Sequence, residues 1–149
     1  LASCTNVVVR NCRSHDNDGC GIMLHMSCRH CLVEGNVFYR NRINGISLAI
    51  ATDCAILNNL CWNNGLAADN KYAHIYVDFQ VSWCNIQGNT CRYHDTVVRP
   101  KAGIEITNAG GGAVKNLVTN NDLLNSGVTP FINGGSATVT TAGNRVGSY

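Results

Sequence analysis

A six-residue pattern that recurs along the chain constrains its fold more than any other feature of the sequence. The pattern is an apolar residue, any residue, an apolar residue, a polar residue, Gly or Asn, and a final Asn. The clearest copies lie at 31–36, 54–59 and 84–89, and looser ones at 7–12 and 116–121. Successive copies end at steps of 24, 23, 30, 32 and 23 residues, at Cys12, Asn36, Asn59, Asn89, Asn121 and Asn144. A unit of 23 or 24 residues with two insertions accounts for these steps.

A second motif follows within the units and alternates inward and outward positions with a period of two. It occurs at 21–24, 45–48, 74–77 and 103–106, with Ile in the second position of every copy. This period predicts short strands with one buried face. The two insertions fall mainly before this strand, around residues 64–73 and 92–102, and the glycine run 110–112 adds a smaller one.

The repeat excludes several other repeat architectures. The units have no helical periodicity, which excludes leucine-rich and ankyrin solenoids, and propeller blades need roughly 40 or more residues each. We therefore predict an all-β fold, a right-handed single-stranded parallel β-helix of about five or six coils. Equivalent residues of successive coils would then stack in columns at a spacing of about 4.8 Å.

The two motifs together resemble the parallel β-helix repeats of the pectate-lyase-like superfamily. This superfamily includes pectate lyases, polygalacturonases, alginate lyases and epimerases, and phage tailspike depolymerases. The resemblance extends from Asn6 to about Asn144. It implies the fold and, more generally, action on carbohydrates. It assigns no catalytic residue, because the repeat residues are structural in all of these proteins.

Aligning the copies sorts the side chains into columns. We expect an inward aliphatic column of Val9, Val33, Ile56, Ile86 and Val118. A second inward column would contain Cys31, Cys54 and Cys84. An asparagine ladder is expected at a turn, from Asn36, Asn59, Asn89 and Asn121. The chain has nine cysteines, and we expect reduced thiols that fill the coil interior rather than disulfides or a metal site.

Length and composition set further bounds. The 149 residues are 45% hydrophobic and 13% charged, with a net charge of +2 and scattered Lys and Arg. We therefore expect one domain, residues 1–149, that neither binds nucleic acid nor spans a membrane. The start at Leu1, without Met, favours a fragment or short version of a longer β-helix protein. An extracellular or virion-associated location is favoured, and free thiols leave an intracellular one open.

The outward side of the second-motif strands, beside both insertions, is the face best suited to chemistry. Asp78 and Glu105 would lie one coil apart with an offset of two residues, a diagonal on the order of 8 Å. That separation suits the two carboxyl groups of an inverting glycoside hydrolase. Glu105 would be the acid, with a raised pKa, and Asp78 the base. His74 adds a third candidate catalytic group at the start of its strand.

A polysaccharide lyase would use other side chains of the same groove. Its base removes a proton beside a uronate carboxylate, and a cation neutralises that carboxylate. Arg99 or Lys101 could supply the cation, and His94, His74 or Tyr76 could act as the base. The candidate substrate-binding residues are Tyr72, Tyr76, Tyr93, His25, His94, Arg99 and Lys101.

No cofactor is expected from the sequence, apart from calcium if the protein is a lyase. The segment 15–19 lacks the acidic spacing of a calcium loop and is predicted to be a turn. A zinc site from Cys28, His30 and Cys31 is disfavoured, because the coil interior accounts for Cys31.

Two functions remain open. The first is a polysaccharide-active enzyme, a glycoside hydrolase or a polysaccharide lyase, that takes a polysaccharide or oligosaccharide into the groove. The second is a non-catalytic structural or carbohydrate-binding module, such as a segment of a phage tailspike or surface protein. Such a module would assemble as a homotrimer or end to end through its exposed coil ends.

Overall fold

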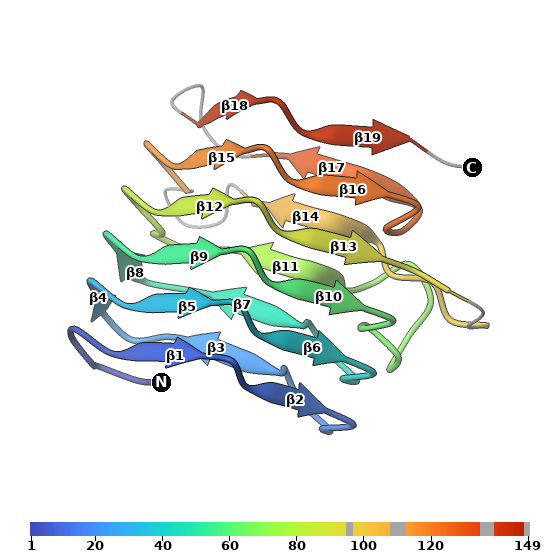
Figure 1. The fold of residues 1–149 in the computed structure, drawn as a ribbon, viewed down its shortest axis with the longest axis horizontal. Coiled ribbons are helices and arrows are strands. Elements are labelled where there is room, and N and C mark those ends of the chain that lie inside the picture. The colour runs from blue at the N-terminus through green and yellow to red at the C-terminus, as the bar shows by residue number, and fades with distance from the viewer. Residues whose placement is uncertain (95–96, 108–112, 135–138, 148–149) are drawn as a thin grey trace.

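The computed structural model describes residues 1–94, 97–107, 113–134 and 139–147. In this part of the chain every strand pair is parallel. The coils stack in chain order from the N-terminus to the C-terminus (Figure 1). This architecture confirms the predicted right-handed parallel β-helix. The described residues contain no helix that could cross a membrane.

Three long sheets and one short sheet run along the stack. The first sheet contains β1 (Val8–Arg10), β5 (Leu32–Glu34), β9 (Ala55–Leu57), β12 (Asn85–Gln87), β15 (Leu117–Thr119) and β18 (Thr140–Ala142). The second contains β2 (Arg13–His15), β6 (Val37–Tyr39), β10 (Leu60–Trp62), β13 (Thr90–Arg92), β16 (Asp122–Leu124) and β19 (Arg145–Gly147). The third contains β3 (Ile22–Leu24), β7 (Ile46–Leu48), β11 (Ala73–Val77), β14 (Ala102–Ile106) and β17 (Thr129–Asn133). The short sheet pairs β4 (Cys28–Arg29) with β8 (Ala51–Thr52).

The core consists of the predicted columns. The aliphatic column is in register across the first sheet, from Val9 through Val33, Ile56 and Ile86 to Val118. Cys31, Cys54 and Cys84 are each 1% exposed, and all nine cysteines are free. Burial raises the pKa of the Cys61 thiol well above its ordinary value, so this thiol is neutral inside the coil.

A row of buried asparagines lines the bend between the first and second sheets. Asn89 illustrates its bonding: Nδ2 donates to Asn121 Oδ1 at 3.0 Å and to the Ile56 carbonyl at 2.9 Å. Its own Oδ1 accepts from the backbone N and the Nδ2 of Asn59, both at 3.0 Å. The same pattern joins Asn36 to Asn59. Each side chain therefore connects neighbouring coils, which satisfies polar groups that would otherwise be buried without partners.

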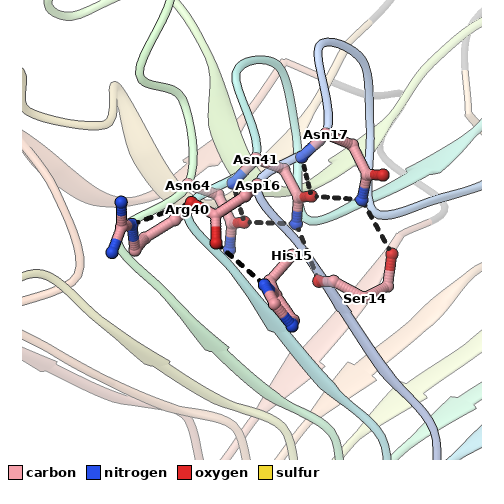
Figure 2. Close-up of polar contacts among 7 residues, drawn as sticks. All are labelled: Ser14, His15, Asp16, Asn17, Arg40, Asn41 and Asn64. Carbon is pink, nitrogen blue, oxygen red and sulfur yellow. Dashed lines mark hydrogen bonds and ion pairs between the residues drawn. The ribbon is translucent and has the colours of Figure 1, made fainter.

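A second row lies at the turn that leads from the second sheet to the third. Figure 2 shows Asn17 bonded to Asn41, and Asn41 to Asn64, with Nδ2–Oδ1 distances of 2.8 and 2.9 Å. Beside it, Asp16 accepts from both His15 and Arg40. The His15 ring stacks in turn on Tyr39 at 4.4 Å between centroids.

The two insertions fold against each other beside the third sheet. The Asn70 amide donates to the Arg99 carbonyl at 2.8 Å, and the Lys101 amide to the Tyr72 carbonyl at 2.7 Å. The Arg99 amide also donates to Asp69 Oδ1 at 2.7 Å. These contacts hold the loops before β11 and β14 together. The paired loops form a wall next to the outward face of both strands.

Candidate functional site

A groove of about 460 Å³ lies over the outward face of the third sheet. Its floor is made of two columns that the parallel register aligns. The first column runs Met23, Ser47, Tyr76 and Glu105. The second contains His25, Ala49 and Asp78, two residues further along each strand. The paired insertion loops contribute Lys71, Tyr72 and Lys101, and Cys20, Ile43 and Asn44 complete the lining.

The two carboxylates of the floor are held by different partners. Glu105 is only 6% exposed and forms an ion pair with Lys101 Nζ. Asp78 accepts a hydrogen bond from Thr107 Oγ1 at 2.6 Å. The Lys101 ammonium thus occupies the Glu105 carboxyl group, which fits the predicted role of proton donor less well. Asp78 keeps carboxylate acceptor capacity towards the groove.

Tyr76 lies between these carboxylates. Burial raises its pKa above the ordinary tyrosine value, and the charges of Asp78 and Glu105 raise it further. Its hydroxyl therefore keeps its proton at neutral pH. In this position Tyr76 is suited to donate a proton or a hydrogen bond, and less suited to act as a base.

Cations and rings meet at the loop side of the groove. Lys71 Nζ lies 5.3 Å from the centroid of the Tyr72 ring. Lys101 is 38% exposed in its side chain and borders the same space. This wall can therefore offer two ammonium groups to an anionic ligand and an aromatic ring to the face of a sugar.

The structure corrects the placement of His74. Its side chain is 0% exposed and does not line the groove. His74 lies beside Gly45 and Gly103 in the register of the third sheet. At these glycines an added Cβ would approach the side chains of Asn64 and Ser126, because the preceding turn covers the strand start. His74 therefore cannot contact a substrate in the groove.

Burial lowers the pKa of His74 to about 3, so the imidazole is neutral. Asn64 Nδ2 lies 3.2 Å from its Nδ1. The described residues provide no hydrogen-bond partner for its Nε2. His74 is consequently a structural residue whose protonation would place a charge inside the β-helix.

Three further predicted site residues also lie outside the groove. Tyr93 is fixed to the neighbouring coil by its amide, which donates to the Asn125 carbonyl at 2.7 Å. His94 is exposed, and its amide donates to Asn63 Oδ1 at 2.6 Å. Arg99 pairs with Asp69 at 3.8 Å. None of the three lines the groove.

Six predicted residues do come together in the groove: His25, Tyr72, Tyr76, Asp78, Lys101 and Glu105. The structure adds Lys71, Ser47 and Met23 to the set. Ser47 and Met23 lie in the outward column of the alignment. The sequence prediction omitted them from the site because they are neither charged nor aromatic. No pattern in the sequence indicates that Lys71 lines the groove and Arg99 does not, because both lie in insertions whose residues follow no repeat.

Stacked parallel coils with a polar groove over one sheet define a β-helix protein of the pectate-lyase-like superfamily. A family model described as "Periplasmic copper-binding protein (NosD)" matches residues 1–146, and the chain belongs to this family. No curated protein matches the sequence.

Two solved structures are similar, and both are A-modules of Azotobacter vinelandii mannuronan C-5 epimerases. The AlgE4 module has a TM-score of 0.79 and 20% identity over 93% of this chain and 38% of its own. The AlgE6 module has a TM-score of 0.75 and 15% identity over 96% of this chain and 42% of its own. At these identities the likeness shows the fold. The chain spans about two fifths of each module.

The copper in the family description can be tested against the donors that the chain presents. Among the described residues, no three His, Cys, Asp or Glu side chains form a group that could hold a metal ion. Thioethers are a further class of soft donor and suit Cu(I), as imidazole does. Met23, His25 and Met26 carry donors of this kind at and just after β3, but only Met23 and His25 line the groove.

Proposed function

We propose that the groove binds a polysaccharide rich in uronic acid and that the protein acts on it by proton transfer beside the uronate carboxylate. The observation that carries this proposal is the meeting of Lys71 and Lys101 with Tyr72, Tyr76 and Asp78 in one groove. Ammonium groups match the carboxylates of such a polymer, and the rings match the apolar faces of its sugars.

The proposed chemistry assigns a role to three side chains of the groove. Lys101 stabilises the charge that develops on the uronate carboxylate when the adjacent carbon loses its proton. Asp78 is the base that accepts this proton, and Tyr76 is the proton donor. Return of a proton to the opposite face of the carbon gives an epimer. Departure of the oxygen at the neighbouring carbon gives chain cleavage with an unsaturated sugar.

The similar structures support a uronate substrate, since both are described as mannuronan C-5 epimerases. Inverting hydrolysis fits the groove less well, because Glu105 is engaged by Lys101. His25, at the first coil, would contact a sugar further along the polymer. A non-catalytic carbohydrate-binding module remains the alternative and would bind the same polymer without turnover.

The proposal is tested by comparing the ligand affinities of two variants, each of which lacks one cation of the same loop. We expect Lys101→Met to weaken the binding of a mannuronate hexasaccharide about tenfold, because one charge-assisted contact is lost. Arg99→Met removes a cation of the same loop that lies outside the groove, and it should leave the affinity unchanged. Isothermal titration calorimetry at low salt, with a neutral hexasaccharide as second ligand, measures both. Equal affinity of wild type and Lys101→Met would contradict the proposal.

Turnover is tested on the polymer in heavy water, with and without added calcium. Deuterium at the carbon beside the carboxylate indicates an epimerase, and ultraviolet absorbance of unsaturated uronate indicates a lyase. New reducing ends without either signal indicate a hydrolase and would contradict the proposed chemistry. Asp78→Asn should abolish deuterium incorporation with little loss of binding. Binding by the wild type with no reaction would establish the non-catalytic alternative.

A further inference from the structure

The groove changes character along the stack of coils. Over β11 and β14 it is lined by two lysines and two carboxylates. Over β3 and β7 the described lining lies within residues 20–49 and contains no Lys, Arg, Asp or Glu. Met23, Ile43 and Ala49 give this second part apolar side chains. The two parts therefore suit different chemical groups of one bound polymer.

Met23 presents apolar surface to the groove. It is 41% exposed, although methionine is among the residue types that are most often buried. Leu24 beside it is fully buried, so the Met23 side chain points to the outward face of the third sheet. An apolar group of a ligand would remove this surface from water, which is a gain that a sugar hydroxyl does not supply.

Asn44 adds a hydrogen-bond donor to the apolar part of the groove. It is only 6% exposed, and its Oδ1 accepts from the Ala73 amide at 3.0 Å, which identifies Nδ2 as the donor atom. The partner of Nδ2 in the structure is Cys20 Sγ at 3.9 Å, a long contact with a weak acceptor. Because Nδ2 carries two hydrogens, this nearly buried amide can still donate to a carbonyl oxygen in the groove.

An acetyl group combines the two features that these side chains match, a methyl group and a carbonyl oxygen. We infer that the groove over β3 and β7 binds an acetyl substituent of the polymer, with Met23 against the methyl group and Asn44 donating to the carbonyl oxygen. Burial raises the pKa of the neighbouring Cys20 thiol, so this side chain adds no charge to the pocket. The inference rests on the proposed function and narrows its substrate to an acetylated uronate polymer.

The acetylated sugar is a different one from the sugar that reacts. Met23 is in register with Ser47, and Ser47 with Tyr76. Two coils therefore separate Met23 from Tyr76, a distance of about 10 Å at the spacing of parallel strands. Proton transfer at Tyr76 and Asp78 takes place on one sugar, while the acetyl group of another sugar selects which stretch of the polymer enters the groove.

The test compares ligands that differ only in their acetyl groups. The first pair is a mannuronate hexasaccharide and its O-acetylated form. The second is a hexasaccharide in which glucuronate alternates with N-acetylglucosamine, and its counterpart with glucose at those positions. We expect the acetylated member of at least one pair to bind about tenfold more tightly in calorimetry, because it adds one methyl contact and one hydrogen bond. The pair that responds distinguishes an ester from an amide, and equal affinities within both pairs would overturn the inference.

The two methionines of the chain provide a matched pair of variants. Met26 is 54% exposed and does not line the groove. Met23→Gln should lower the preference for the acetylated ligand at least threefold, whereas Met26→Gln should retain it. Asn44→Asp keeps an acceptor for the Ala73 amide and removes the donor, so it should lower the preference as well. A full preference in both Met23→Gln and Asn44→Asp would overturn the assigned contacts.

The acetyl site and the uronate groove fail separately. If acetylated and plain ligands bind equally and Lys101→Met weakens both, the acetyl site is overturned and the uronate groove stands. If the acetyl preference persists while Lys101→Met leaves every affinity unchanged, the uronate proposal fails and the acetyl site stands. Absence of binding for all four ligands would overturn both.

Discussion

Replacement of Asn89 by Ala is expected to lower the free energy of unfolding by about 4 kcal/mol. Asn89 is fully buried, and its amide joins three coils through hydrogen bonds to Asn59, Asn121 and the Ile56 carbonyl. Truncation leaves several of these polar groups buried without partners, each at a cost of about 1–3 kcal/mol. Urea unfolding monitored by circular dichroism measures the loss.

Asn17→Ala provides the matched control. Asn17 ends the second asparagine row and makes comparable bonds to Asn41 and Ser14, but it is exposed. Water can replace those bonds, so we expect a loss below about 1 kcal/mol. Losses of similar size in the two variants would show that the buried row does not hold the coils together.

Acidification is expected to destabilise the protein through His74. The pKa of this imidazole is about 3 in the folded chain and 6.5 in the unfolded chain, since burial disfavours the charged form. Between these values the unfolded chain binds a proton that the folded chain does not, so stability falls as pH falls. From pH 7.5 to pH 5 the loss should be about 2 kcal/mol, and it should continue towards pH 3.

The window from pH 7.5 to pH 5 lies above the usual range of carboxyl groups, and so it reports mainly on histidine. His74→Asn removes the titrating ring and keeps an oxygen that can accept from Asn64. This variant should lose most of the pH dependence in denaturant unfolding. His94→Asn, at an exposed position, should retain it. A wild-type protein of constant stability across the window would contradict the buried neutral imidazole.

The fold could be predicted because each coil repeats the same pattern of inward apolar and outward polar residues. The columns through Val9 and through Cys31 follow from counting two dozen residues per turn, and the register confirms them. His74 was misplaced because alternation assigns it to the outward face. The other residues of its column, Gly21, Gly45 and Gly103, could have indicated its burial. A column of glycines indicates that the turn covers that position.

The site was predictable only where it belongs to the repeat. Tyr76, Asp78 and Glu105 lie on strands whose direction the period fixes, and they reach the groove. Residues of the insertions follow no period, so Tyr93 and His94 could not be distinguished from Lys71 and Tyr72. The two loops contact each other through backbone hydrogen bonds between residues far apart in the sequence, and a local sequence pattern does not predict such contacts.

The central claim, that the groove over the third sheet is where a uronate polymer binds, is tested most directly by hydrogen–deuterium exchange. The outer side of the second sheet is the competing surface, because Tyr39 and Trp62 stack there at 4.6 Å. With a mannuronate hexasaccharide we expect slower exchange in residues 71–78 and 101–107 and no change in 37–40 and 60–63. Protection confined to the second sheet, or none at saturating ligand, would contradict this account.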